Sequence, residues 1–141
     1  MKDREKLAEK LGLMIQKANR SLDAARRLAA AGDHDFASAR AYYAAFYGIQ
    51  AALLSIGLSP SKHSGAIHLF NQHFIKTELF PADFSKLIGR LFSERQTGDY
   101  TFDLRFAETD ATQNIEMAET VLQAITAYLV EQGLMPEYTD Q

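Results

Sequence analysis

The chain has 141 residues and a formal net charge of −3, and 47% of its residues are hydrophobic, which is typical of one globular domain. It contains no cysteine, which excludes a disulfide framework, a cysteine zinc site, an iron–sulfur cluster and a thiol nucleophile. The acidic balance also argues against a dedicated non-specific nucleic-acid binder, so any such role must depend on a local basic patch.

Charged residues begin at the second position, and no apolar stretch is long enough to span a bilayer. We therefore expect no signal segment, no association with a membrane and a cytoplasmic location.

The first half of the chain shows two different helical patterns. Apolar residues recur every three or four positions through residues 3–31, which predicts an amphipathic helix that ends at Gly32. Asp33 or Asp35 is expected to cap the next helix. Residues 36–56 are apolar around nearly the whole helical circumference, which predicts a central, buried helix.

The middle of the chain predicts two further helices. A short one is expected over residues 64–77, and Pro81 is expected to be the first residue of the next. Residues 98–106 are expected to be irregular, because a glycine and polar residues interrupt the apolar pattern.

A last helix is predicted from Asp110, with Gln113 as its capping-box partner, to Gly133. No segment shows the alternation of a strand. The sequence therefore predicts an all-α, antiparallel up-and-down bundle of four main helices and one short extra helix. We expect residues 1–134 to form this domain and residues 135–141 to be a frayed tail.

Arg40 is a charge within the most apolar helix, and Tyr43 and Tyr47 follow it on the same helical face. Two interpretations stay open, because a buried guanidinium needs an acceptor. Arg40 either pairs with a carboxylate of a neighbouring helix, or lines a pocket for a phosphate or a base with the two tyrosines. Together with Tyr42, these tyrosines are also suited to simple packing or to an interface.

A second polar group lies at residues 95–100 (RQTGDY), directly after an apolar stripe. It is either a helix end rich in hydrogen-bonding groups or a phosphate site. In the second case Arg95 supplies a planar, permanently charged fork, and Tyr100 stacks or hydrogen-bonds.

The histidines do not predict a metal site. His63, His68 and His73 are five residues apart, so they do not share a helical face, and His63 is expected in a loop or at a helix cap. The sequence has no phosphate-binding glycine loop, zinc-protease motif or serine nucleophile elbow. We expect no metal and no cofactor.

Three segments together resemble one family, the HEPN (higher eukaryotes and prokaryotes nucleotide-binding) domain in its small stand-alone prokaryotic branch. They are residues 38–46 (SARAYYAAF), 62–65 (KHSG) and 95–100 (RQTGDY). The resemblance implies a four-helix bundle with an extra short helix, a homodimer, and a small nucleotidyltransferase as partner protein in a toxin–antitoxin-like pair.

Ribonucleases of this superfamily carry an arginine followed, after four to six residues, by a histidine. Arg95 matches the arginine, but Asp99 and Tyr100 lie where the histidine is expected. The resemblance therefore favours a non-catalytic module that binds a partner protein and RNA or a nucleotide. The expected ligand-binding residues are Arg40, Tyr43, Tyr47, His63, Arg95, Asp99 and Tyr100.

Two alternatives remain. One is a metal-independent ribonuclease toxin in which Arg95 stabilises the transition state and Asp99 or Tyr100 replaces the histidine. The other is that these polar residues are structural, with a buried ion pair between Arg40 and Asp99.

Overall fold

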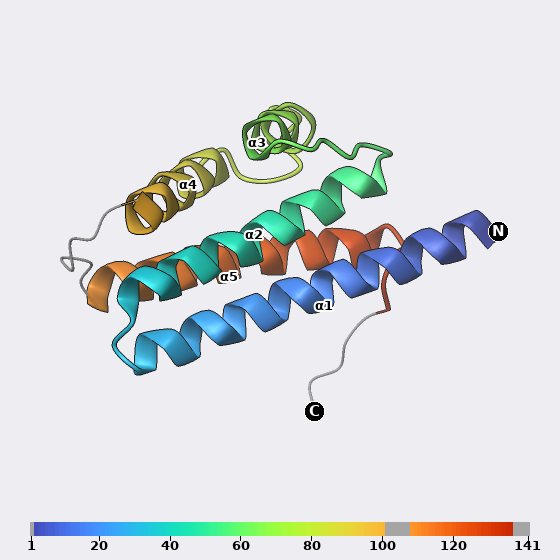
Figure 1. Cartoon of the computed structure of the whole chain (residues 1–141). Coiled ribbons are helices and arrows are strands. Elements are labelled where there is room, and N and C mark those ends of the chain that lie inside the picture. The colour runs from blue at the N-terminus through green and yellow to red at the C-terminus, as the bar shows by residue number, and fades with distance from the viewer. Residues whose placement is uncertain (1, 101–107, 137–141) are drawn as a thin grey trace.

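The structure, a computed structural model, describes residues 2–100 and 108–136, with the backbone alone for residues 96–100. The described residues form five α-helices and one π-helical turn, and none of them is in a strand, which confirms the all-α prediction. Consecutive long helices run in opposite directions, as an up-and-down bundle requires (Figure 1). The elements are α1 (Lys2–Ala30), α2 (His34–Ser55), α3 (His63–Phe70), the π-helical turn η1 (Asn71–Ile75), α4 (Phe84–Tyr100) and α5 (Glu108–Glu131).

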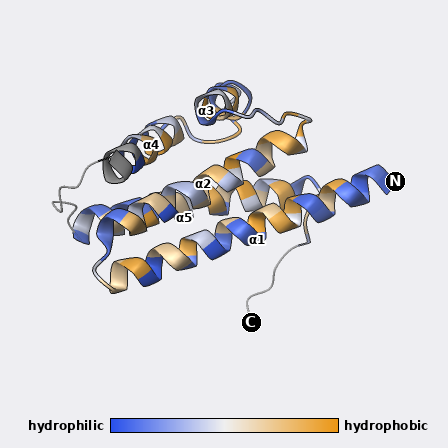
Figure 2. Cartoon of the chain, viewed as in Figure 1, coloured by the Kyte–Doolittle hydropathy of each residue, from blue (hydrophilic) through white to orange (hydrophobic). Residues whose placement is uncertain are grey.

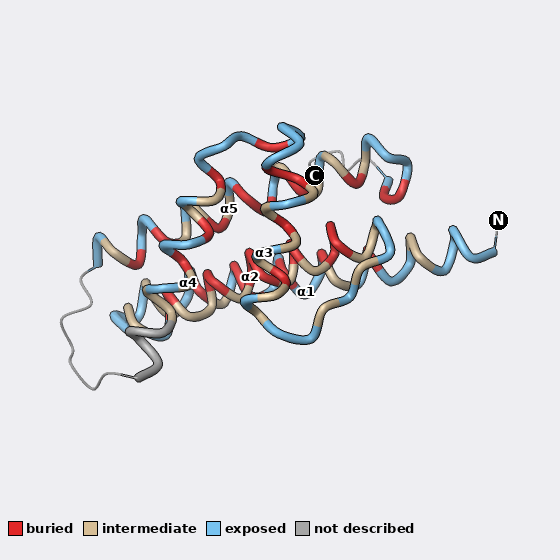
Figure 3. Tube along the Cα trace, turned by 90° about the horizontal axis from the view of Figure 1, so that it is seen from above, coloured by how far each residue is buried: buried red, intermediate tan, exposed pale blue. Residues whose placement is uncertain are grey.

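The helix α2 is the centre of the bundle, as its sequence predicts. It contacts α1, α3, α4 and α5, and its buried residues cover most of its circumference, whereas the face of Arg40, Tyr43 and Tyr47 is half-buried. Figure 3 shows these buried positions along the middle of the molecule, and Figure 2 shows that the hydrophilic N-terminal end of α1 extends beyond them. A polar side chain on α2 must therefore find its partners on neighbouring helices.

Within the described part of the chain, no helix has the length and apolar character needed to cross a bilayer.

Gly48 allows α2 and α5 to approach closely. A Cβ atom at this position would lie 3.1 Å from Cδ1 of Leu122 and 3.3 Å from Cδ1 of Ile125. Both distances are tight for carbon atoms, whose contacts are optimal at about 3.5–4.0 Å. The missing side chain therefore sets the distance between these two helices.

The predicted ends of the first two helices agree with the structure to within about two residues. Gly32 follows α1 with φ +88° and Gly57 follows α2 with φ +84°, a conformation that glycine adopts without strain. Asp33 is the N-cap residue of α2, but its side chain makes no capping hydrogen bond.

The prediction of one regular helix over residues 64–77 is wrong in its second half. After Phe70 the chain makes the π-helical turn, in which the N–H of Lys76 donates to the Asn71 carbonyl at 2.8 Å. The additional residue in this turn places both Phe74 and Ile75 in the core.

Pro81 is not the first residue of a helix, because α4 begins at Phe84. The ring of Phe80 is buried against Phe74, at a centroid distance of 5.7 Å, and the N–H of Phe80 donates to the Phe74 carbonyl at 2.9 Å. These contacts fix the direction of the chain before α4, so Pro81 lies in the preceding turn, where its carbonyl accepts from Phe84 at 3.0 Å.

Two further boundaries need correction. The helix α4 continues to Tyr100, so residues 98–100 are helical, whereas residues 101–106 lie outside the described residues. The helix α5 begins at Glu108, and Asp110 is in its first turn, where a carboxylate is favoured by the helix dipole. Gln113 bonds to Arg90 of α4, with its Oε1 accepting from Nη2 at 2.7 Å.

Replacement of Gly48 tests the close approach of α2 and α5. We expect Gly48→Leu to lower the free energy of unfolding by about 1–3 kcal/mol, because the new side chain has no space beside Leu122 and Ile125. The measurement is equilibrium unfolding in urea.

Gly89→Ala is the matched control, since a Cβ at this helical position meets nothing within 4 Å. It should raise the free energy of unfolding by up to about 1 kcal/mol through helix propensity. A Gly48→Leu protein as stable as the wild type would show that α2 and α5 are not in tight contact.

Candidate functional site

Arg95 of α4 lies with its guanidinium against three aromatic rings. Its Cζ is 5.0 Å from the ring centroid of Tyr42, 5.7 Å from that of Tyr43 and 5.5 Å from that of Phe92. A cation within about 6 Å of a ring centroid is attracted by the π electrons, and the attraction grows as water is removed. Arg95 is half-buried. The rings therefore hold this charge in place at the edge of the bundle.

His63, the first residue of α3, contacts the same tyrosine. Its Nδ1 is 2.9 Å from the hydroxyl oxygen of Tyr42, and its ring stacks on Phe46 at a centroid distance of 4.0 Å. Its ring also meets the edge of Tyr43 at 5.9 Å. The fold thus brings together side chains of α2, α3 and α4, which we call the Arg95 cluster: Tyr42, Tyr43, Phe46, His63, Phe92 and Arg95.

The hydroxyl of Tyr42 connects Arg95 with His63. Tyr42 is only 1% exposed, so its O–H needs a protein partner. Arg95, which can only donate, hydrogen-bonds to the hydroxyl oxygen. The O–H of Tyr42 is then donated to Nδ1 of His63. On this hydrogen-bond network we assign His63 as neutral, with its proton on Nε2.

The pKa values of both ring groups agree with this assignment. Burial raises the pKa of Tyr42 to about 12, although the charge and hydrogen bond of Arg95 act in the opposite direction. Burial, and to a smaller extent the positive charge of Arg95, lower the pKa of His63 below its usual value of 6.5. At neutral pH the cluster therefore presents one cation beside two neutral hydrogen-bonding rings.

A buried polar network fixes α4 beside this cluster. Asn114 of α5 is 0% exposed, and its Nδ2 donates to Oγ of Ser38 on α2 at 3.0 Å and to Oε2 of Glu94 on α4 at 2.5 Å. The other oxygen of Glu94 accepts from Nε of Arg90 at 2.8 Å. Since Glu94 directly precedes Arg95, these bonds determine where α4 holds the guanidinium.

The predicted face of Arg40, Tyr43 and Tyr47 is partly joined to this cluster. Tyr43 contacts both arginines, with Cζ of Arg40 4.7 Å and Cζ of Arg95 5.7 Å from its ring centroid. The ring centroid of Tyr47 lies 6.1 Å from that of Tyr43, and Nζ of Lys17 lies 4.9 Å from the Tyr47 centroid. The structure thus brings four of the predicted residues together and adds Tyr47 at their edge.

The interpretation that pairs Arg40 with a carboxylate finds no support among the described side chains, where Arg40 is in no ion pair. The aromatic ring of Tyr43 stabilises the half-buried charge. The side chains of Asp99 and Tyr100 lie outside the described residues. Their predicted roles, and the predicted pair of Arg40 with Asp99, stay predictions.

Tyr42, Phe46 and Phe92 were not predicted as site residues. Tyr42 was expected only to pack or to form an interface, although an aromatic hydroxyl in a largely buried helix signals a need for polar partners. Phe92 precedes Arg95 by three residues and so shares its helical face, which was an available signal. No local pattern could have indicated Asn114, whose partners are on other helices.

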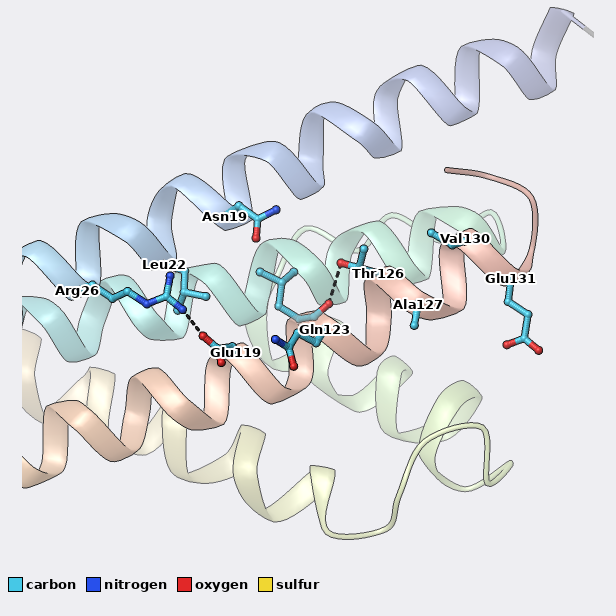
Figure 4. A pocket seen from close by; sticks show the side chains of 10 residues that line it. Asn19, Leu22, Arg26, Glu119, Gln123, Thr126, Ala127, Val130 and Glu131 are labelled. Atoms are coloured by element: carbon cyan, nitrogen blue, oxygen red, sulfur yellow. Dashed lines mark hydrogen bonds and ion pairs between the residues drawn. The ribbon is translucent and has the colours of Figure 1, made fainter. Parts of the chain in front are cut away.

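Another hollow lies between α1 and α5, with a volume of about 560 Å³ (Figure 4). Its wall includes the apolar side chains of Leu22, Leu122 and Val130. Its cation, Arg26, is already bound to Glu119. This hollow shares no lining residue with the Arg95 cluster, and it has no unpaired cation for an anionic ligand among its lining residues. Among the described residues no group of histidines and carboxylates is arranged to hold a metal ion.

Comparisons with known proteins agree on the family. The family model of the HEPN domain matches residues 12–129. A Methanocaldococcus jannaschii protein named "Putative toxin MJ0142" is 31% identical over 127 residues, which cover 90% of this chain and 86% of that protein. A UPF0332 protein of Thermotoga maritima is 38% identical over 125 residues, which cover 89% and 92% of the two chains.

A solved structure shares the fold. It is the crystal structure of ST0689, an archaeal HEPN homologue, which matches with a TM-score of 0.70 and 21% identity. The match covers 84% of this chain and 97% of that chain.

The pKa of His63 tests the arrangement of the cluster. We expect NMR titration to give a value below 6.5, and Arg95→Gln to raise it, because the substitution removes a neighbouring positive charge. A pKa at or above 6.5 in the wild type would contradict the burial of the ring beside Arg95.

The lowered pKa of His63 also makes the stability of the fold depend on pH. Unfolded His63 takes up a proton as the pH falls through 6.5, whereas the folded residue resists protonation, so stability decreases below that pH. Urea unfolding at pH 7.5 and 5.5 should show a larger decrease for the wild type than for His63→Gln. Equal decreases in the two proteins would contradict the prediction.

Removal of Asn114 tests the network beneath Arg95. Asn114→Ala should lower the free energy of unfolding by about 1–3 kcal/mol, because Glu94 and Ser38 lose their buried partner. Thr112→Ala is the matched control at an exposed position of the same helix and should not lower the free energy of unfolding. Equal effects of the two substitutions in urea unfolding would contradict this role of Asn114.

Proposed function

This chain belongs to the HEPN domain family, and we propose that residues 1–134 are the HEPN module of a toxin–antitoxin-type pair. In this proposal the module is a cytoplasmic homodimer. It binds a nucleotidyltransferase-like partner protein, and it holds a phosphate of RNA or of a nucleotide at the Arg95 cluster.

One observation carries the proposal for the phosphate: the Arg95 guanidinium is held by aromatic rings beside a neutral histidine. A planar guanidinium matches two oxygens of a phosphate, and its fixed position reduces the entropy lost on binding. With the proton on Nε2, His63 adds a hydrogen-bond donor of the kind a phosphate oxygen accepts. Since the chain has a net charge of −3, such a local site is what an anionic ligand requires.

The proposal for the partners is supported by the family and by the surface around the cluster. A relative that matches 90% of this chain bears the name "Putative toxin MJ0142", which suits one half of a toxin–antitoxin pair. Tyr43 and Tyr47 are half-buried at the edge of α2, and aromatic residues of this kind are enriched in protein interfaces.

Binding of a fluorescently labelled single-stranded RNA of 12 nucleotides, measured by anisotropy, tests the phosphate site. We expect Arg95→Gln to weaken binding about tenfold or more, since a hydrogen bond to a charged group contributes about 1.5–3 kcal/mol. Lys86→Gln on the exposed side of α4 removes the same charge and should have little effect. Equal affinity of the wild type and Arg95→Gln would contradict the site, and a monomer in light scattering would contradict the homodimer.

A metal-independent ribonuclease toxin is the second candidate, and the position of His63 favours it. No histidine follows Arg95 in the sequence, yet the fold brings His63 to the same tyrosine. In this reaction a base removes the proton of the 2′-hydroxyl, whose oxygen attacks the adjacent phosphorus while the 5′-oxygen leaves. A base needs a free lone pair, which Nε2 lacks in the assigned tautomer, so we favour binding over cleavage.

An RNA cleavage assay in the presence of EDTA separates the two candidates. We expect no cleavage by the wild type. Cleavage that is lost in Arg95→Ala and His63→Ala would instead establish the nuclease, and loss in Asp99→Asn or Tyr100→Phe alone would assign the base to the end of α4.

A further inference from the structure

A basic groove lies between α1 and α2, next to the Arg95 cluster. Its volume is about 360 Å³, and four of the side chains that line it are cations: Lys17, Arg20 and Arg27 of α1 and Arg40 of α2. The three cations of α1 are three and seven residues apart in succession, which places them on one face of the helix. We call this feature the α1–α2 groove.

The charge of the α1–α2 groove is opposite to that of the whole chain. Its lining contains one carboxylate, Asp23, which already accepts a hydrogen bond from Nη1 of Arg26 at 3.0 Å. Within the described residues, none of the four cations of the groove forms an ion pair. The groove therefore concentrates positive charge on a protein whose net charge is −3.

A row of contacts joins the groove to the Arg95 cluster. The ammonium group of Lys17 lies 4.9 Å from the centroid of Tyr47, which lies 6.1 Å from that of Tyr43. Cζ of Arg40 lies 4.7 Å, and Cζ of Arg95 5.7 Å, from the ring centroid of Tyr43. Cations and aromatic rings thus form a continuous row from α1 across α2 to α4, in which the rings position Lys17, Arg40 and Arg95.

We infer that the α1–α2 groove binds the sugar–phosphate backbone of single-stranded RNA and directs the strand to the Arg95 cluster. The inference rests on the proposed function, because it takes RNA as the ligand of that cluster. A row of cations suits a polymer with one charge at every unit, and aromatic residues beside such cations are typical of grooves that follow a single strand. An acidic protein segment carries its charges less regularly and is the competing occupant.

The dependence of RNA affinity on salt tests this inference. Each phosphate contact on a single strand contributes about 0.7 to the slope of log K against log salt concentration. The double substitution Lys17→Gln with Arg27→Gln removes two exposed cations of the groove and leaves the Arg95 cluster intact. We expect it to reduce the slope by about 0.7 for each lost contact and to weaken binding at low salt.

The matched control is Lys76→Gln with Lys86→Gln, which removes the same charge from exposed positions outside the groove. It should leave the slope unchanged. Thermal unfolding verifies that both double variants are folded, which is expected because all four side chains are exposed.

The remaining outcomes separate this inference from the proposed function. Suppose that the wild type binds RNA and that Arg95→Gln weakens binding, but that the groove variant keeps the wild-type salt slope. This result would contradict RNA binding in the α1–α2 groove and would still support the Arg95 site. If the wild type binds no RNA at low salt, both are overturned. If poly-L-glutamate displaces RNA as effectively as unlabelled RNA of equal charge, the groove suits an acidic protein chain and the inference is overturned.

Discussion

The hydroxyl of Tyr42 is the group on which the arrangement of the candidate site depends. It lies on a helix that contacts four others, and a buried hydroxyl without a partner costs free energy. Its partners come from two other helices, Arg95 from α4 and His63 from α3. Because one oxygen accepts from the arginine and its hydrogen is donated to the histidine, the tyrosine fixes a cation and the tautomer of an imidazole at once.

The aromatic rings of α2 also determine where positive charge lies on the molecule. The chain as a whole is acidic, yet aromatic rings of α2 hold Arg40 and Arg95 near one another, and Lys17 of α1 continues the row. Rings stabilise a cation without neutralising it, as a carboxylate would, so the positive potential stays accessible to a ligand. A local anion site on an acidic HEPN module is therefore physically consistent, and the hollow between α1 and α5, where Arg26 is paired with Glu119, lacks this property.

Periodicity predicted much of the fold, because helices are encoded by local patterns. The central helix predicted over residues 36–56 corresponds to α2, and spacing alone predicted that Arg40, Tyr43 and Tyr47 share one face. The failures have a non-local cause: burial of Phe74 and Phe80 in a shared aromatic cluster introduces the π-helical turn and delays the start of α4 to Phe84. The contact of Tyr42 with His63 joins residues 21 apart on different helices, so no spacing rule could predict it.

In the proposed anion site Tyr42 acts on ligand binding by positioning Arg95, and a double-mutant cycle measures this coupling. The measurement is the affinity for single-stranded RNA of the wild type, Tyr42→Phe, Arg95→Gln and the double variant. Tyr42→Phe should weaken binding when Arg95 is present and have almost no effect in the Arg95→Gln protein, with a coupling energy of about 0.5–3 kcal/mol. The same effect of Tyr42→Phe in both backgrounds, or no effect in either, would contradict this role of Tyr42.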